Sequence, residues 1–160
     1  MRVDRAFEAL YEEEFPAVFR AAYLLCGDRQ LAEDATQEAF ARALERWRRL
    51  RDQPWVGGWV TSTALNIVRR SLRRRARMPA FPADVASRSE PEEAVDLWRA
   101  VRELPPRQQE AVVLHHVVDL SVADCARLMR CSEGSVKRHL SRARASLADW
   151  AESSDENAAA

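Results

Sequence analysis

Glycine is scarce in this chain and long apolar runs are absent, which favours a helix-rich protein and argues against a membrane-spanning one. Only 4 of the 160 residues are glycine, while 47% are hydrophobic and 31% charged, which is typical of a soluble, helix-rich protein. No stretch approaches the roughly 20 apolar residues that a membrane-spanning helix needs. The first residues are acidic and amphipathic, without the hydrophobic run of a signal peptide, so we expect a cytoplasmic protein.

Cysteine is also rare, and its spacing argues against a disulfide framework or a metal site. The three cysteines, Cys26, Cys125 and Cys131, form no CxxC pair, and an odd number favours a reducing compartment. The three histidines are not spaced as zinc ligands relative to these cysteines. We therefore expect neither a metal nor a cofactor, and the thiols are interpreted as buried or surface groups. A redox role for Cys125 and Cys131 stays open.

The formal net charge is zero, but the two signs of charge occupy separate blocks of the sequence. Residues 1–45 carry five arginines and ten acidic residues, whereas residues 46–78 carry ten arginines and one acidic residue. Residues 79–126 are again acidic, 127–150 basic and 151–160 acidic. Such blocks create local fields that the net charge conceals. Two separate basic surfaces, each flanked by acidic ones, are therefore expected.

The apolar residues repeat every three or four positions in nearly every segment, which predicts an all-α fold. A first helix should end at Gly27, and Pro16 should kink it or mark a join. Asp28 is suited to cap a second helix. The PWVGG stretch at 54–58 breaks the pattern and is interpreted as a flexible loop before a third helix over 59–77.

The composition changes between Met78 and Pro91, which predicts a linker. This stretch holds three prolines and two serines and has no apolar periodicity. We therefore expect two small helical domains, 1–77 and 92–150, joined by a flexible linker over 78–91. The acidic end, 151–160, is expected to be a disordered tail.

The last part of the second domain predicts a helix-turn-helix. SVAD at 121–124 fits a capping box, a short turn follows, and Ser132 is suited to cap the next helix. On that helix, one face is apolar and the other carries small polar and cationic residues, which suit phosphates and base edges. The candidate DNA contacts on it are Ser135, Lys137, Arg138, Ser141 and Arg142. An αα-hairpin with a solvated basic face is the alternative, and Arg130 stands in the turn where glycine is common.

A second basic element lies in the first domain, in the region from Trp55 to Arg77. Aromatic rings beside cations form the composition that stacks and holds unpaired bases, although an arginine run can also simply solvate a helix. The candidate residues are Trp55, Trp59, Asn66, Arg69, Arg70, Arg73 and Arg74. Two tethered basic helices suggest bipartite DNA recognition, because tethering raises the effective concentration of the second contact.

Three stretches together resemble a known family in their order and spacing. They are AEDATQEAF (32–40), WVTSTALNIVRRSLRRR (59–75) and LPPRQQEAVVLHHVVDLSVADCARLMRCSEGSVKRHLSRARASL (104–147). The chain resembles bacterial sigma-70 factors of the extracytoplasmic-function (ECF) group over roughly residues 6–149. The resemblance implies a factor that binds core RNA polymerase, recognises the −10 and −35 promoter elements and promotes DNA melting for transcription initiation.

The resemblance also assigns expected roles to residues. The second helix would be the main docking surface for the polymerase β′ coiled-coil, through Asp34, Gln37, Glu38 and Phe40. The Trp55–Arg74 candidates would hold the −10 strand, and the helix-turn-helix would enter the major groove at −35 and meet the β flap. An anti-sigma factor, whose identity the residues do not give, is the expected inhibitor.

Three other classes of protein compete with this interpretation. A DNA-binding regulator that acts alone, as a dimer, would not need the acidic helix at 32–45. An enzyme lacks support, since the sequence offers no nucleophile–base pair, no phosphate-cradling glycine loop and no metal spacing. A purely structural helical adaptor leaves both arginine-rich helices unexplained.

Overall fold

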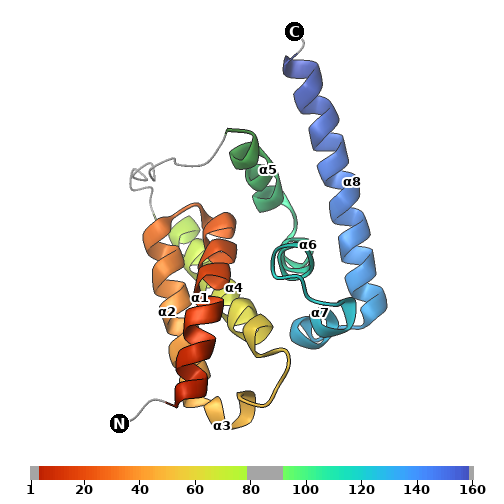
Figure 1. Ribbon diagram of the computed structural model, residues 1–160. Helices are drawn as coiled ribbons and strands as arrows, with labels where there is room; N and C mark the ends of the chain where they lie inside the picture. Colours follow the sequence, from red (N-terminus) through yellow and green to blue (C-terminus); the bar gives the residue numbers. More distant parts are fainter. Residues whose placement is uncertain (1–3, 79–91, 159–160) are drawn as a thin grey trace. The chain divides into compact units, whose positions relative to one another are not determined.

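The computed structural model describes residues 4–78 and 92–158, and these residues are helical throughout apart from short connections (Figure 1). The chain divides into two compact units, one reaching Ser87 and the other beginning at Arg88. The predicted all-α fold in two helical parts is therefore confirmed. The predicted linker lies outside the described residues except for Met78, so its boundaries stay predictions. Among the described helices, none is both long and apolar enough to cross a membrane.

The first unit is built from three long helices and one short one. They are α1 (Arg5–Cys26), α2 (Arg29–Glu45), α3 (Trp47–Leu50) and α4 (Val56–Arg77). Each of the three long helices packs against the other two (Figure 1). Their shared core is aliphatic and aromatic, and its largest fully buried side chains include Val18, Leu24, Phe40, Val60, Leu65 and Val68.

The junction between α1 and α2 forms as the sequence predicts. Gly27 ends α1 in the left-handed conformation at φ 65°, which a residue without a Cβ adopts without strain. One carboxylate oxygen of Asp28 accepts the amide N–H of Leu31 at 3.0 Å and so caps α2. The other oxygen accepts Nη1 of Arg75 at 2.7 Å, which fastens the cationic end of α4 to this junction.

A second carboxylate fastens the start of α1 to α3. Asp4 caps α1 by accepting the amide N–H of Ala6 at 3.0 Å, and its second oxygen accepts Nε1 of Trp47 at 2.9 Å. Arg51 lies 3.5 Å from the same oxygen. These contacts, the Trp47 hydrogen bond first, lower the pKa of Asp4.

The PWVGG stretch is not the predicted loop. The helix α4 begins at Val56, so both glycines lie inside its first turn. Glycine at position 57 leaves room for a neighbouring side chain rather than forming a turn, because a Cβ added there would lie 2.6 Å from the carboxyl carbon of Glu14 on α1. Pro16 marks no join either, because α1 continues through it as one helix.

The second unit contains the predicted helix-turn-helix preceded by three further elements. The elements are α5 (Glu92–Glu103), α6 (Pro106–Val112), the π-helical turn η1 (Val113–Val117), α7 (Val122–Met129) and α8 (Glu133–Ala158). The core of the unit gathers around α8 and includes Val101, Leu114, Cys125, Met129, Val136 and Ala143.

The tail differs from the disordered segment expected for residues 151–160, because α8 continues as far as Ala158 (Figure 1). The segment contains neither glycine nor proline to stop the helix, and alanine and glutamate favour helical backbone. Both serines keep their hydroxyls within the helix. Ser153 donates to the carbonyl of Asp149 and Ser154 to that of Trp150, each at 2.9 Å.

Candidate nucleic-acid and protein interfaces

The turn between α7 and α8 has the caps that the sequence predicts. Ser121 caps α7, with its hydroxyl oxygen accepting the amide N–H of Asp124 at 3.1 Å. Ser132 caps α8 in the same way, accepting the amide N–H of Ser135 at 3.1 Å. Between them, Arg130 takes the left-handed conformation at φ 54°, the place where glycine would avoid steric strain. The helix-turn-helix is confirmed.

The helix α8 buries one face and exposes a cationic one. Val136 and Ala143 are fully buried and fix the rotation of the helix against the core. The predicted DNA contacts fall on the other side: Lys137, Arg138, Ser141 and Arg142 are exposed and Ser135 is half-buried. Arginine and lysine on an exposed helix face are the groups that neutralise phosphates in a DNA groove.

His139 lies half-buried at the edge of this face and adds little charge to it. Burial lowers its pKa, and the positive charges of Arg107, Arg142 and Arg138 lower it further. The imidazole is therefore mostly neutral at pH 7. The cationic character of α8 comes from its lysine and arginines.

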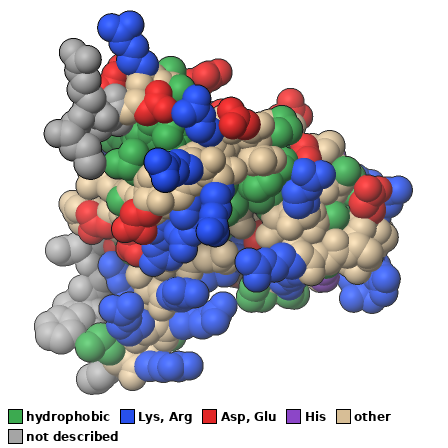
Figure 2. Space-filling view, turned by 90° about the horizontal axis from the view of Figure 1, so that it is seen from below, with side chains coloured by type: hydrophobic (Ala, Val, Ile, Leu, Met, Phe, Trp, Pro, Cys, Tyr) green, Lys and Arg blue, Asp and Glu red, His purple; other side chains and the backbone are tan. Residues whose placement is uncertain are grey.

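The candidate face of α4 is also exposed, with one exception. Asn66, Arg70, Arg73 and Arg74 are exposed, and Figure 2 shows Lys and Arg side chains crowded over one part of the surface with few acidic ones between them. The expectation that Arg69 faces outward is wrong, because Arg69 is only 9% exposed. Its Nη1 donates to Oδ1 of Asn66 at 3.2 Å. Arg69 can therefore orient Asn66 but does not present its charge at the surface.

The two tryptophans of the first basic element are half-buried. Trp59 carries a cation on its ring face, since the guanidinium carbon of Arg46 lies 5.8 Å from the ring centroid. Sequence reasoning missed this arginine and its neighbours as candidates. The exposed arginines around α3 are Arg46, Arg48, Arg49 and Arg51. The basic block over 46–78 was the signal that could have found them.

The candidate docking residues of α2 divide into exposed and buried ones. Asp34, Gln37 and Glu38 are exposed. Asp34 accepts a hydrogen bond from Gln30 at 2.9 Å, and Glu38 forms an ion pair with Arg42, so both carboxylates are held along the helix.

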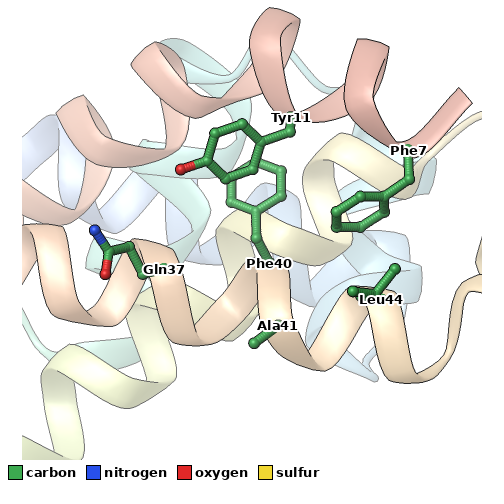
Figure 3. A pocket seen from close by; sticks show the side chains of 6 residues that line it. All are labelled: Phe7, Tyr11, Gln37, Phe40, Ala41 and Leu44. Atoms are coloured by element: carbon green, nitrogen blue, oxygen red, sulfur yellow. The ribbon is translucent and has the colours of Figure 1, made fainter. Parts of the chain in front are cut away.

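Phe40, by contrast, is 2% exposed and belongs to the core. Its ring centroid lies 4.8 Å from that of Tyr11, a residue that sequence reasoning did not select (Figure 3). A shallow groove of about 150 Å³ opens between α1 and α2, lined by Phe7, Tyr11, Gln37, Phe40, Ala41 and Leu44. Exposed polar residues beside a small apolar groove suit a partner helix that inserts a side chain.

The cysteines do not form a reactive centre in the part of the chain that the structure describes. Cys125 is fully buried, and burial raises the pKa of its thiol to about 11, with the Asp124 carboxylate as the next cause. The thiol is therefore protonated at neutral pH and is a poor nucleophile. Over the same residues, no group of three or more His, Cys, Asp or Glu side chains could hold a metal ion.

Two family models match the chain, one in each unit. The model described as Sigma-70 region 2 matches residues 10–78. The model described as Sigma-70, region 4 matches residues 94–147. These ranges contain both arginine-rich helix faces and the exposed side of α2.

Curated relatives match across both units. The ECF RNA polymerase sigma factor BldN of Streptomyces coelicolor is 35% identical over 156 residues, which cover 89% of this chain and 59% of that protein. The ECF RNA polymerase sigma factor SigM of Mycobacterium tuberculosis is 33% identical over 148 residues, which cover 89% of this chain and 76% of that protein.

Solved structures share the fold. The sigma factor RpoE, solved with the anti-sigma factor NepR from Bartonella quintana, aligns with a TM-score of 0.76 at 22% identity, covering 93% of this chain and 98% of that one. CnrH, solved with the cytosolic domain of CnrY, aligns with a TM-score of 0.73 at 24% identity, covering 93% and 89%. At such identities the likeness concerns the fold alone.

Proposed function

Because this chain belongs to the sigma-70 family, in the extracytoplasmic-function (ECF) group of RNA polymerase sigma factors, we propose that its two units divide promoter recognition between them. A sigma factor serves transcription initiation and is not an enzyme, since the polymerase carries out the bond chemistry. The observation that carries the proposal is that each unit presents its own arginine-rich helix face, on α4 and on α8.

The first unit has the groups needed to hold the −10 element. Arg70, Arg73 and Arg74 would neutralise the phosphates of the separated strand, and Asn66 would reach an unpaired base. Trp59 with Arg46 would offer a stacking surface beside them. Capturing a base outside the duplex offsets the few kcal/mol that unstacking costs, and so promotes melting.

The second unit has the groups needed to read the −35 element in duplex DNA. The exposed face of α8 would lie in the major groove, with Lys137, Arg138 and Arg142 as phosphate or base contacts near its N-terminus. The same unit would meet the β flap of the polymerase.

The exposed acids of α2 and the adjacent groove support docking on the polymerase β′ coiled-coil. Asp34 and Glu38 supply negative charge, and Gln37 lies at the rim of the groove. Phe40 would contribute by supporting the groove from the core. Such a factor would work in the cytoplasm with promoter DNA and core polymerase. An anti-sigma factor is a further partner that we propose, and the sigma factor RpoE was solved with one.

A pull-down of bacterial core RNA polymerase tests docking. The wild-type chain should retain the polymerase, and the double variant Asp34→Arg, Gln37→Ala should not. The first substitution reverses a charge, and the second removes the amide side chain at the rim of the groove. Asp52→Arg is the matched control, since Asp52 is an exposed acid whose side chain is 84% exposed, outside α2. Tight duplex binding by the isolated chain, together with no polymerase binding, would instead favour a self-sufficient DNA-binding regulator.

A further inference from the structure

Arg107, near the start of α6, joins two elements of the second unit. Its Nη1 donates to Oε2 of Glu110 at 3.0 Å, one turn further along α6. Its Nη2 donates to the backbone carbonyl of Met129, the last residue of α7. A planar guanidinium presents several donors in a fixed fork, so one arginine can hold both acceptors at once.

The Glu110 carboxylate fixes the direction in which Arg107 points. The Glu110 side chain is 4% exposed and that of Arg107 is 47% exposed. A buried carboxylate is stable only with a cation or hydrogen-bond donors beside it, and this requirement holds the guanidinium over the end of α7. The charges of this pair also act on the pKa of His139 on α8: Arg107 lowers it and Glu110 raises it.

The carbonyl that Arg107 binds lies in the turn of the helix-turn-helix. The last carbonyls of a helix have no partner within the helix. The next residue, Arg130, takes the left-handed conformation at φ 54°, which is strained for a residue with a Cβ. The turn is closed by the amide N–H of Cys131, which donates to the carbonyl of Ala126 at 3.0 Å. A charged donor on the Met129 carbonyl adds a tertiary tie to this strained turn.

We propose that Arg107 is a positioning residue: it holds the turn between α7 and α8 closed and thereby sets the orientation in which α8 meets DNA. The first half of this inference, that Arg107 holds the turn closed, is independent of the proposed function. The second half, that the turn sets the orientation of α8 on DNA, rests on the proposed function. The alternative is a direct phosphate contact by Arg107, and the two internal hydrogen bonds of its guanidinium argue against it.

Amide hydrogen exchange in the free 160-residue chain tests whether Arg107 holds the turn closed. Removing Arg107 alone would take a cation away from the buried Glu110 carboxylate and so destabilise the unit, which is why the test variant is Arg107→Met with Glu110→Gln. The Cys131 amide should exchange about tenfold faster, the loss expected for one charge-assisted hydrogen bond. The Leu140 amide, inside α8, should change less than about twofold.

Two further variants make this result specific. Adding Arg130→Gly relieves the strain of the turn and should slow the Cys131 exchange again by about fivefold. Arg99→Met with Asp96→Asn is the charge-matched control, since it also removes one ion pair between residues three apart on a helix, and the Arg99 side chain is 60% exposed. An unchanged Cys131 amide, equal acceleration of both amides, or no recovery with Arg130→Gly would overturn the proposal.

Promoter selection by the holoenzyme, which is this chain bound to core polymerase, tests whether the closed turn orients α8 on DNA. With core polymerase and a random promoter library, the Arg107→Met, Glu110→Gln variant should weaken enrichment at the −35 position and leave the −10 position unchanged, and Arg130→Gly should restore it. Equal loss at both positions would overturn the positioning role. A wild-type holoenzyme that enriches no promoter sequence would contradict the proposed function. The hydrogen-exchange result would still show whether Arg107 holds the turn closed.

Discussion

Replacing Asp28 with alanine should destabilise the first unit by about 1.5 kcal/mol. About 1 kcal/mol comes from the lost cap on α2, where the carboxylate accepts the Leu31 amide at 3.0 Å. The remainder, about 0.5 kcal/mol, comes from the lost pair with Arg75, whose side chain is 57% exposed and therefore screened by water. For a unit of this size the Tm should fall by roughly 6–12 °C.

Two variants separate these contributions in urea unfolding followed by circular dichroism and tryptophan fluorescence. Asp28→Ser keeps a capping oxygen but removes the charge, so it should cost less than about 0.5 kcal/mol. Arg75→Met removes only the ion pair, so its loss of unfolding free energy should equal that of Asp28→Ser. Equal losses for Asp28→Ser and Asp28→Ala would refute the assignment of the larger share to the cap.

The pH dependence of this effect has a definite sign. The Leu31 amide first, and then Arg75, hold the pKa of Asp28 below its ordinary value of 3.8. Because the pKa is lower in the folded state, the stabilisation is complete above about pH 4 and is lost as the pH falls through the folded-state pKa. The stabilities of wild type and Asp28→Ala should therefore converge in acid. A gap that stays constant down to about pH 2 would show that the carboxylate does not supply it.

Three other variants or treatments test separate parts of the structure. Phe40→Ala should lower the unfolding free energy of the first unit by about 3–5 kcal/mol, measured in urea, because it leaves a cavity in the core; a stable variant that fails only to bind polymerase would contradict its burial. Gly57→Ala should leave the Tm of the first unit unchanged or raise it, because the Glu14 carboxyl is the end of a flexible side chain that can move aside and alanine favours helix more than glycine does; a clear fall in Tm would show that the Glu14 side chain is held in place. Cys125 should resist iodoacetamide at pH 8 until the chain unfolds, measured by mass spectrometry, because its pKa is about 11; rapid labelling of the folded chain would contradict the protonated, buried thiol.

Local signals in the sequence predicted the caps and the helix-turn-helix, because each depends on a few neighbouring residues. Asp28, Ser121 and Ser132 all cap the helices that follow them, as side chains of their type do. The apolar spacing along α8 likewise identified its buried face, since a helix repeats every 3.6 residues.

Features that depend on packing between distant segments could not be predicted in this way. Gly57 reads as a loop residue until Glu14, 43 positions earlier in the chain, is found against it. Arg69 has the charge of a surface residue, but α4 contacts both α1 and α2, and its buried surface is wider than a single stripe. Phe40 matches a docking position of the family, yet the aromatic residues of α1 enclose it.

The exposure of the candidate DNA contacts is a structural result, whereas their individual roles stay predictions. Arg75 illustrates the difference, because it lies in the arginine run of α4 but is held by Asp28. Arg73 and Arg74 are exposed on the same run. The charge pattern identified the helix, and only the contacts indicate which of its arginines remain available at the surface.

Transcription from a random promoter library by core RNA polymerase, with and without this chain, tests the central claim most directly. The sequenced transcripts should start downstream of two enriched elements at a fixed spacing, and only when the chain is present. Arg138→Gln should weaken enrichment at the upstream element alone, and Arg73→Gln at the downstream one. Start sites that are the same with and without the chain would contradict its role as a sigma factor.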